Sequence, residues 1–343
     1  MSPLNRRRFE NFRANRRGWW SLWVFAAIFV VTLFAEFVAN DRPIVARVDG
    51  RWFFPVVRDY AESDILSDGF PTDVDWYDPT LLREIGERGW AVWPPVPFSH
   101  RTVVRDLGQP APSPPSARNP LGTDDQARDV LARIIHGFRI SVLFGFTLTI
   151  LSSVIGVIAG AVQGYYGGWV DLAFQRVIEI WSGMPQLLLL IILASVIEPT
   201  FFSLLIFLLL FSWMSLTGVV RAEFLRGRNL DYVRAARALG VSDTRLMLRH
   251  ILPNAMVATL TMVPFILAGS VTVLASLDFL GFGLPPGSPS LGELVSQAKN
   301  NLRAPWLGIT AFVVLGGMLA LLAFVGEAVR DAFDPRKLPG GGR

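Results

Sequence analysis

Seven arginines lie between Arg221 and Pro253, in a polar segment that separates two long apolar runs. The spacing of apolar residues in the middle of this segment predicts a short helix that ends at Gly240, where glycine can adopt a left-handed backbone. Small side chains on such a helix suit close docking in a groove of another protein. The residues that carry this prediction are Tyr232, Arg234, Ala235, Ala236, Arg237, Leu239 and Gly240.

Two short helices are expected within this segment. Asn229 or Asp231 can cap the first by accepting hydrogen bonds from its free N–H groups, and Ser242 can cap the second. Pro253 then lies at the join to the next apolar run. A basic amphipathic hairpin of this kind would also suit a membrane surface rich in anionic lipids, so both interpretations stay open at this point.

The sequence lacks the motifs with which a chain binds nucleotides or hydrolyses bonds. No G-x-x-x-x-G-K-[ST], H-E-x-x-H or G-x-S-x-G occurs in the 343 residues. His100, His136 and His250 lie far apart and show no metal-ligand spacing, and the absence of cysteine excludes disulfides and thiolate metal sites. We therefore expect no enzyme activity, no cofactor bound by this chain, and an energy source in a cytosolic partner.

Apolar blocks long enough to cross a bilayer dominate the chain, which is 52% hydrophobic and only 17% charged. A helix of about 20 apolar residues spans the hydrocarbon core. The sequence thus predicts an all-α polytopic membrane protein whose first span is an uncleaved anchor, because no A-x-A cleavage site follows it. Six spans are expected, at residues 19–38, 139–163, 181–198, 202–220, 255–277 and 306–326.

The distribution of arginine predicts the orientation of these spans. Residues 1–18 carry six arginines, the 221–253 loop seven, and the tail after residue 326 four Lys and Arg together. With six spans, all three segments fall on the same side, which is then cytoplasmic. We expect residues 1–18 and 336–343 to be cytoplasmic, residues 39–138 to form an insert on the opposite side, and residues 139–335 to form the membrane core. The net charge of +4 reflects a preference for arginine and indicates no nucleic-acid partner.

An ion-coupled secondary transporter or a channel subunit is the alternative function. Ion-coupled carriers usually keep acids or histidines at the middle of the membrane. Here the acids closest to the spans, Glu36, Glu179, Glu198 and Glu327, fall at or near the predicted ends. This placement favours a transporter that draws its energy from a partner.

The 39–138 insert is expected to be small and partly irregular. "DRPIVARVDGRWFFPVVRDY" alternates well enough to predict short strands. Eight prolines between Pro94 and Pro120 predict an extended linker. Residues 119–138 predict an amphipathic helix capped by Thr123 or Asp124, which leads into the second span or, as the alternative, contacts substrate.

The 232–255 segment resembles the cytoplasmic loop of ABC importer permeases, whose pattern is E-A-A, three residues, G, nine residues and I-x-L-P. Ala235, Ala236, Gly240, Leu252 and Pro253 match this pattern at the right spacing, whereas Arg234 replaces the Glu and His250 replaces the Ile. "AARALG" and "RHILPN" are usual in the peptide-importer branch. "NPLGTDDQARD", with Ala127 in place of a glycine, "GGWVD" and "LDFLGFGLPPGSPSLGELV" resemble the second-subunit type of the same branch. The likeness covers residues 119–335, and the 39–118 insert suggests the sub-branch for long-peptide and microcin C uptake.

This resemblance implies a bacterial inner-membrane protein with the six-helix type I importer permease fold, in which 39–138 is a periplasmic insert and 139–335 is the permease core. It also implies a set of partners. They are a second homologous permease, two ATPase domains that hold ATP and Mg, a periplasmic substrate-binding protein and membrane lipids. The helix near 230–240 would dock in a groove of an ATPase, with Arg234 and Arg237 pairing with acids at its rim. Ser270, Thr272 and Ser276 in the fifth span could line the translocation path or serve only in helix packing.

Overall fold

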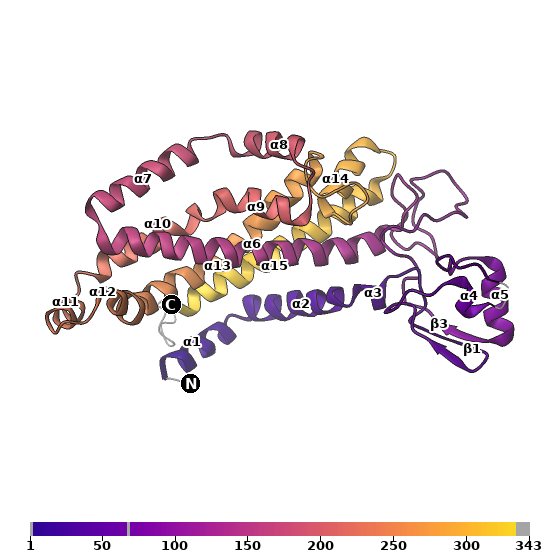
Figure 1. Cartoon of the computed structure of the whole chain (residues 1–343), viewed down its shortest axis with the longest axis horizontal. Helices are drawn as coiled ribbons and strands as arrows, with labels where there is room; N and C mark the ends of the chain where they lie inside the picture. Colours follow the sequence, from indigo (N-terminus) through magenta and orange to yellow (C-terminus); the bar gives the residue numbers. More distant parts are fainter. Residues whose placement is uncertain (1–2, 67–68, 334–343) are drawn as a thin grey trace. The chain divides into compact units, whose positions relative to one another are not determined.

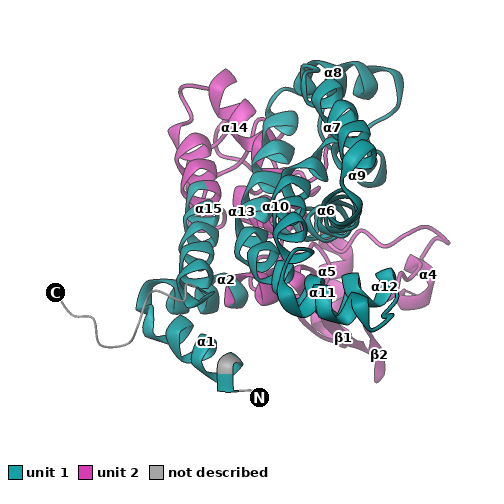
Figure 2. Cartoon of the chain, turned by 90° about the vertical axis from the view of Figure 1, so that its left-hand side faces the viewer, with its two compact units in different colours: residues 1–26, 142–285, 316–343 teal, residues 27–141, 286–315 magenta. Residues whose placement is uncertain are grey.

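A computed structural model describes residues 3–66 and 69–333, which form long helices and a small sheet (Figure 1). The predicted tail at 336–343 lies outside the described residues. The chain divides into two compact units (Figure 2). Unit 1 comprises residues 1–26, 142–285 and 316–343, and unit 2 comprises residues 27–141 and 286–315.

The helices follow one another along the chain with few long interruptions after residue 130. Before that point lie α1 (Pro3–Ala14), α2 (Arg16–Leu33), α3 (Ala35–Val38), α4 (Glu62–Ile65) and α5 (Pro79–Arg88). After it come α6 (Val130–Tyr166), α7 (Gly168–Ser182), α8 (Gln186–Val196), α9 (Phe201–Ser212), α10 (Met214–Gly227), α11 (Asp231–Ala238), α12 (Asp243–Arg245), a π-helical stretch (Leu246–Ile251), α13 (Leu252–Phe279), α14 (Leu291–Asn300) and α15 (Pro305–Phe333).

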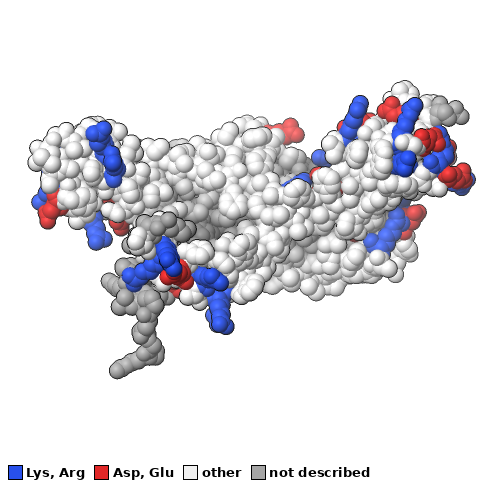
Figure 3. All heavy atoms as spheres, turned by 90° about the horizontal axis from the view of Figure 1, so that it is seen from below, with Lys and Arg blue, Asp and Glu red and all other residues white. Residues whose placement is uncertain are grey.

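Four helical stretches are long and apolar enough to cross a membrane: Val130–Tyr166, Phe201–Gly227, Asp243–Phe279 and Pro305–Phe333. A fifth is possible if α7 and α8, which are bent by 72° at their break, form one span. The six predicted spans are therefore not confirmed. The visible face of the long helices in Figure 3 is almost free of charged side chains.

Several helices differ in their bounds from the predicted spans. The 139–163 span is part of a helix that starts at Val130, and the 181–198 span is interrupted at residues 183–185, where Pro185 cannot donate a backbone hydrogen bond. The 202–220 span continues to Gly227 after a break at Trp213. The 19–38 span is divided between α2 and α3.

Three glycines bring α6 and α10 into close contact within unit 1. Gly156, Gly160 and Gly164 are four residues apart and therefore lie on one face of α6. A Cβ atom on them would lie 2.6, 2.6 and 2.5 Å from the carbonyl oxygens of Trp213, Thr217 and Arg221 respectively. Only glycine permits this approach, which is the small-residue packing common between membrane helices.

Two apolar clusters fill unit 1. One joins α6, α8, α9 and α13 through residues such as Phe144, Leu190, Leu208 and Leu274. The other joins the ends of α6, α10 and α13 to the segment around α11. The second cluster fixes the arginine-rich segment to the spans that flank it.

Unit 2 contains a three-stranded antiparallel sheet of order β2-β1-β3, formed by β1 (Val45–Val48), β2 (Arg51–Phe53) and β3 (Gly89–Val92). The short strands predicted in the insert are thus confirmed, and the all-α class is corrected to mostly helical. Residues 94–120, all of which are described, form no helix or strand and only two isolated bridges, of Val96 with Ala39 and of Val103 with Arg128. Their role as an extended linker stays a prediction.

The helix predicted at 119–138 begins only at Val130. Asp129, rather than Thr123 or Asp124, accepts a hydrogen bond from the N–H of Ala132, at 2.7 Å. Ala127 has φ +60°, a left-handed conformation that favours the glycine found there in the family motif. Glycine, the residue of the motif that this segment resembles, would adopt this conformation without strain.

A buried ion network holds residues 124–133 to α14 inside unit 2. The Arg133 side chain is fully buried, and its Nη2 donates to Glu293 at 2.6 Å and to the carbonyl of Ser288 at 3.0 Å. Arg128 Nε donates to Asp124 at 2.7 Å. Removing one partner of a buried ion pair leaves the other charge buried and unpaired, so the loss of any one of these residues should destabilise the fold of unit 2.

Two histidines of unit 2, His100 and His136, lie with their ring centres 4.7 Å apart and their ring planes tilted by 45°. His136 Nε2 contacts the carbonyl of Ala39 at 2.9 Å, which identifies this nitrogen as the protonated one. Burial lowers the pKa of His100 to about 3, helped by the charges of His136 and three nearby arginines. The fold thus brings together two histidines that lie 36 residues apart in the sequence.

Candidate coupling site

The predicted short helix exists as α11, and its end has the expected geometry. Gly240 has φ +81°, which confirms the predicted left-handed position. Its N–H donates to the backbone carbonyl of Arg237 at 3.0 Å, and the N–H of Val241 donates to the backbone carbonyl of Ala236 at 3.2 Å. These are the two hydrogen bonds of a Schellman motif. Gly240 thus closes the helix and turns the chain.

The start of α11 differs from the prediction. Leu230 occupies the capping position and makes no side-chain cap, whereas Asn229 donates from its side chain to the carbonyl of Leu225 at 3.0 Å. Ser242 precedes α12 without a side-chain cap. Instead of forming a separate second helix, residues 243–251 continue into α13, so the 221–253 loop is helical at both ends.

The inner face of α11 is anchored in the apolar cluster at the ends of the spans. Val233 is fully buried against residues that include Phe224, Leu246 and Ile251. Ala236 is partly buried against the same cluster. Since these neighbours belong to α10 and to the stretch entering α13, α11 is packed against both of the spans that flank it.

Pro253 explains the irregular helix that precedes α13. It has no N–H and its ring crowds the carbonyl four residues earlier, so the regular helical ladder cannot form here. The N–H of Leu252 donates to Met247, five residues back, as expected for a π-helix. The carbonyl of His250 accepts a hydrogen bond from the Tyr232 hydroxyl at 3.2 Å. The backbone of His250, rather than its imidazole, is therefore the part that holds α11.

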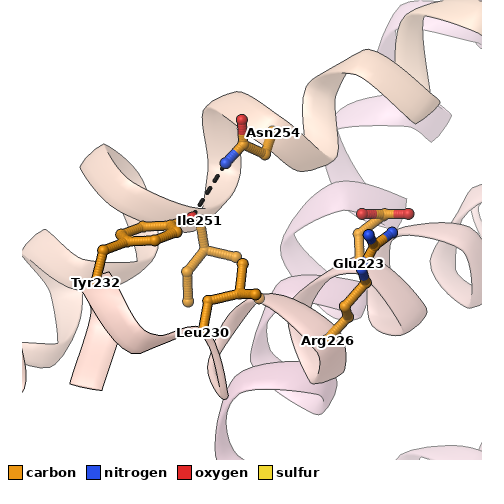
Figure 4. A pocket seen from close by; sticks show the side chains of 7 residues that line it. Glu223, Arg226, Leu230, Tyr232, Ile251 and Asn254 are labelled. Carbon is orange, nitrogen blue, oxygen red and sulfur yellow. Dashed lines mark hydrogen bonds between the residues drawn. The ribbon is translucent and has the colours of Figure 1, made fainter. Parts of the chain in front are cut away.

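A cavity of about 180 Å³ lies beside the start of α11 (Figure 4). Asn254 donates to the Tyr232 hydroxyl at 3.1 Å on one side, and the side chains of Glu223 and Arg226 lie on the other. The remaining lining comes from Gly227, Leu230 and Ile251. Tyr232 thus joins α11 to the first turn of α13.

A second polar link joins this segment to the end of α6. The Tyr165 hydroxyl donates to the carboxylate of Asp243 and accepts a hydrogen bond from Arg237 Nη2 at 3.0 Å. The Arg237 guanidinium also lies 5.4 Å from the centre of the Tyr165 ring, within range of a cation–π contact. Arg237 is therefore engaged inside the chain.

A third link holds the break between α6 and α7. Arg221 forms a two-point ion pair with Asp171, at 2.5 and 2.6 Å. Arg228 donates to the carbonyl of Tyr165 at 3.0 Å, beside the left-handed Gly167. The sequence motif "GGWVD" contained Asp171, but nothing in it indicated Arg221 as the partner.

The outer face of α11 has no cover within the described residues. Leu239 is 85% exposed, which is unusual for so apolar a side chain at the end of a helix. Ala235 and Gly240 are exposed beside it, and Arg234 has no side-chain hydrogen bond or ion pair within the residues that the structure describes. This small, apolar face with one unengaged arginine is the candidate coupling surface.

The structure places the three predicted path residues on α13. Ser270 is buried, Thr272 is exposed and Ser276 is partly exposed. Each hydroxyl donates to the carbonyl four residues earlier, at 2.9, 2.8 and 2.8 Å. Their protons are therefore used within the helix, and only their lone pairs remain for another molecule.

Long apolar helices, with a short exposed helix between two of them, are the architecture of a membrane-embedded protein. The chain belongs to the family of binding-protein-dependent transport system inner membrane components, which matches residues 137–339. It is accordingly a non-catalytic, multi-pass permease component of the inner membrane.

Relatives extend the likeness over almost the whole chain. The chain is 59% identical over 337 residues to the inner membrane ABC transporter permease protein YejE of Escherichia coli K12, with 98% of each chain covered. It is 56% identical over 360 residues to the peptidoglycan transport system permease protein YejE of Agrobacterium fabrum, covering 98% of this chain and 94% of that protein. The dipeptide transport system permease protein DppC of Haemophilus influenzae is 36% identical over 217 residues, covering 63% and 74%.

A solved structure supports the fold. The inward-facing MetNI methionine ABC transporter matches with a TM-score of 0.50 and 17% identity, over 58% of this chain and 96% of the other. At this identity the match concerns the fold alone. It falls short of the whole chain, as expected if the insert in unit 2 is an addition to the permease core.

Proposed function

We propose that this chain is one of two different permease subunits of an ATP-driven importer for peptides or peptide-like compounds. Relatives named for dipeptide, oligopeptide and peptidoglycan transport support this substrate class. Microcin C and long peptides fit the same class. A second permease, two ATPase domains holding ATP and Mg, a periplasmic binding protein and surrounding lipids complete the proposed assembly.

The observation that carries the coupling role is the two-sided character of α11. Its outer face, with Arg234, Ala235, Leu239 and Gly240, is uncovered within the described part of the chain. Its inner face is tied to the spans through Val233 and through the link of Arg237 to Tyr165. A push on the outer face would therefore move the ends of α6, α10 and α13 together.

In this mechanism, an ATPase binds the outer face of α11, and closure of the two ATPase domains on ATP moves the helix as a rigid body. The motion passes to the spans, which rock to alternate access between the two sides of the membrane. Arg234 sets the register by pairing with an acid at the rim of the groove. Arg237 keeps its internal partner, and the hydrogen bond to Tyr165 raises the pKa of Arg237.

The energy source is tested in proteoliposomes that contain the complete transporter with its binding protein. A radiolabelled peptide should accumulate with ATP and not with an imposed proton gradient alone. Accumulation driven by the proton gradient without ATP would favour the ion-coupled carrier instead.

The orientation is tested with single cysteines, which this cysteine-free chain makes possible. Ser63 and Ser242 are both exposed, one in the insert and one beside α11. In intact cells with a permeable outer membrane, an impermeant maleimide should label Ser63→Cys and leave Ser242→Cys unlabelled. The opposite pattern would contradict the proposed cytoplasmic position of α11.

A further inference from the structure

A second, larger cavity of about 380 Å³ lies among the helices of unit 1. Its polar lining is Gln186, Ser212, Ser215 and Ser270, and its apolar lining includes Leu148, Phe211, Phe265 and Val273. No Lys, Arg, Asp or Glu is among the described residues that line it. Of the three path residues predicted from the sequence, Ser270 is the one found here.

The cavity lies near the middle of two of the long apolar helices that line it, as expected for a position inside the membrane. Leu148 lies halfway along the Val130–Tyr166 stretch. Ser212 and Ser215 lie on either side of the midpoint of Phe201–Gly227. Polar side chains at this depth are costly when they face lipid, so they are usually kept where they face a partner or a substrate.

Two helix breaks meet at this cavity. Gln186 is the first residue of α8, directly after the bend at residues 183–185, and Ser212 is the last residue of α9 before the break at Trp213. The carbonyl of Leu210 accepts hydrogen bonds from the indoles of Trp181 and Trp213, at 2.9 and 3.0 Å. Irregular backbone at membrane depth is tolerated where it is buried in protein or lines a cavity, and transporters often bind substrate at such breaks.

The hydrogen bonds of the lining determine what it can bind. Ser212, Ser215 and Ser270 donate to the carbonyls of Leu208, Ser212 and Ile266, at 2.7, 2.8 and 2.9 Å. Since each hydroxyl has a single proton, its oxygen can only accept a bond from a ligand.

Gln186 complements these acceptors. Its amide makes no hydrogen bond to the described residues, so it offers both a donor and an acceptor. A peptide group has the matching acceptor and donor, and its N–H can also be accepted by the serine oxygens. A charged group would be desolvated here without a counter-ion, at a large cost.

We propose that this cavity binds an uncharged peptide group of the substrate as it crosses the membrane, with Gln186 as the residue that recognises it. The apolar lining receives the neighbouring uncharged side chain. This inference rests on the proposed function as a peptide permease, because it assigns a recognition step within the same translocation path.

The test compares a peptide with an analogue in which the internal amide nitrogens are N-methylated, and measures uptake by the complete transporter. N-methylation removes the donor that Gln186 and the serines accept, so the wild type should transport the parent peptide better. Gln186→Leu should reduce uptake of the parent about tenfold, mainly through KM, as expected when one good hydrogen-bond pair is lost. It should reduce uptake of the analogue less, because the analogue keeps only the carbonyl that accepts from the Gln186 amide. The binding protein is the same in every assay, so its own preference cancels in the comparison between variants.

A blocking variant gives an independent test. A Cβ added at Gly269, which lines the cavity, meets nothing within 4 Å, so Gly269→Leu should fold and fill the space. Gly317→Leu is the matched control, since Gly317 also lies in a long helix with nothing within 4 Å and is absent from the cavity lining. Uptake should fall with Gly269→Leu and persist with Gly317→Leu, while both variants keep ATP hydrolysis.

The outcomes separate the recognition step from the proposed function. Suppose that Gln186→Leu takes up the parent peptide as well as the wild type does and prefers it over the analogue to the same degree. This result would overturn the role of the cavity and leave the permease function intact. Equal losses for parent and analogue would show a structural role for Gln186 and would also overturn the inference. No uptake of any peptide by the wild type would refute the proposed substrate class and, with it, this inference.

Discussion

Gly240 offers the sharpest test of how α11 works. The side chains of Asn and Asp have the same shape, and both tolerate a left-handed backbone better than other residues, so Gly240→Asn and Gly240→Asp differ almost only in charge. Gly240→Ala adds a methyl group alone. At φ +81°, each substitution strains the backbone by about 1 kcal/mol.

The surroundings of Gly240 limit the cost to that strain. A Cβ atom at this position meets nothing within 4 Å in the chain, so no internal clash is added. A domain stable by about 5–15 kcal/mol tolerates such a loss and should still insert and fold. A docked ATPase changes this expectation, because an unpaired carboxylate buried in the contact costs more than the 1–3 kcal/mol of a neutral unpaired group.

The assay is co-purification of the ATPase with tagged permease, together with peptide uptake. A penalty of about 3 kcal/mol weakens binding roughly 100-fold. We expect retention of the ATPase to decrease from the wild type through Gly240→Ala and Gly240→Asn to Gly240→Asp, with normal amounts of permease in the membrane. Equal retention in Gly240→Asp and the wild type would refute docking at α11. If only Arg234→Gln impaired function, with the ATPase retained, the lipid-surface interpretation would be supported.

Three further predictions concern folding. Ala127→Gly should raise the free energy of unfolding by about 1 kcal/mol, because it relieves the left-handed backbone at φ +60°. Thermal unfolding of the purified proteins measures this, and a lower midpoint in the variant than in the wild type would contradict it. Gly160→Ala should destabilise by about 1–3 kcal/mol, since its Cβ would lie 2.6 Å from a backbone oxygen; Gly218→Ala, with nothing within 4 Å, is the control that should leave the midpoint unchanged. The folded-state pKa of His100, about 3, lies below its unfolded value, so the unfolded chain binds the proton first and stability is lost as pH falls from about 6.5 towards 3. Between pH 7 and 5 this loss is at most about 2 kcal/mol, and it should be absent in His100→Phe, which keeps the ring and cannot titrate; equal pH dependence in the two proteins would contradict it.

Sequence patterns predicted those parts of the site that depend on near neighbours along the chain. The helix of α11 follows from apolar spacing, and its end at Gly240 follows from the need for a left-handed residue. The strands of the insert follow from alternation. Boundaries were less certain because breaks such as the one at Trp213 have no local signal comparable to Pro185 or Pro253.

The contacts that make α11 part of the permease could not be predicted in this way. Arg237 meets Tyr165 across 72 residues, and Tyr165 meets Asp243 across 78. Arginine and tyrosine have many possible partners, and only the packing of α6 against α10 brings these two together. The spacing of Gly156, Gly160 and Gly164 predicts a close helix contact, but not which helix makes it.

The sequence by itself determined that the chain enters the membrane, that it carries no phosphate-binding G-x-x-x-x-G-K-[ST] motif, and that a short helix ends at Gly240, because these properties depend on composition and local conformation. Tertiary structure alone decided which face of α11 is exposed and which residues hold it. It also brought Gln186, Ser212 and Ser270 from three separate helices around one cavity. The physical reason is that a site made of side chains far apart in the sequence exists only where packing closes the distances between them, and packing is a property of the whole unit.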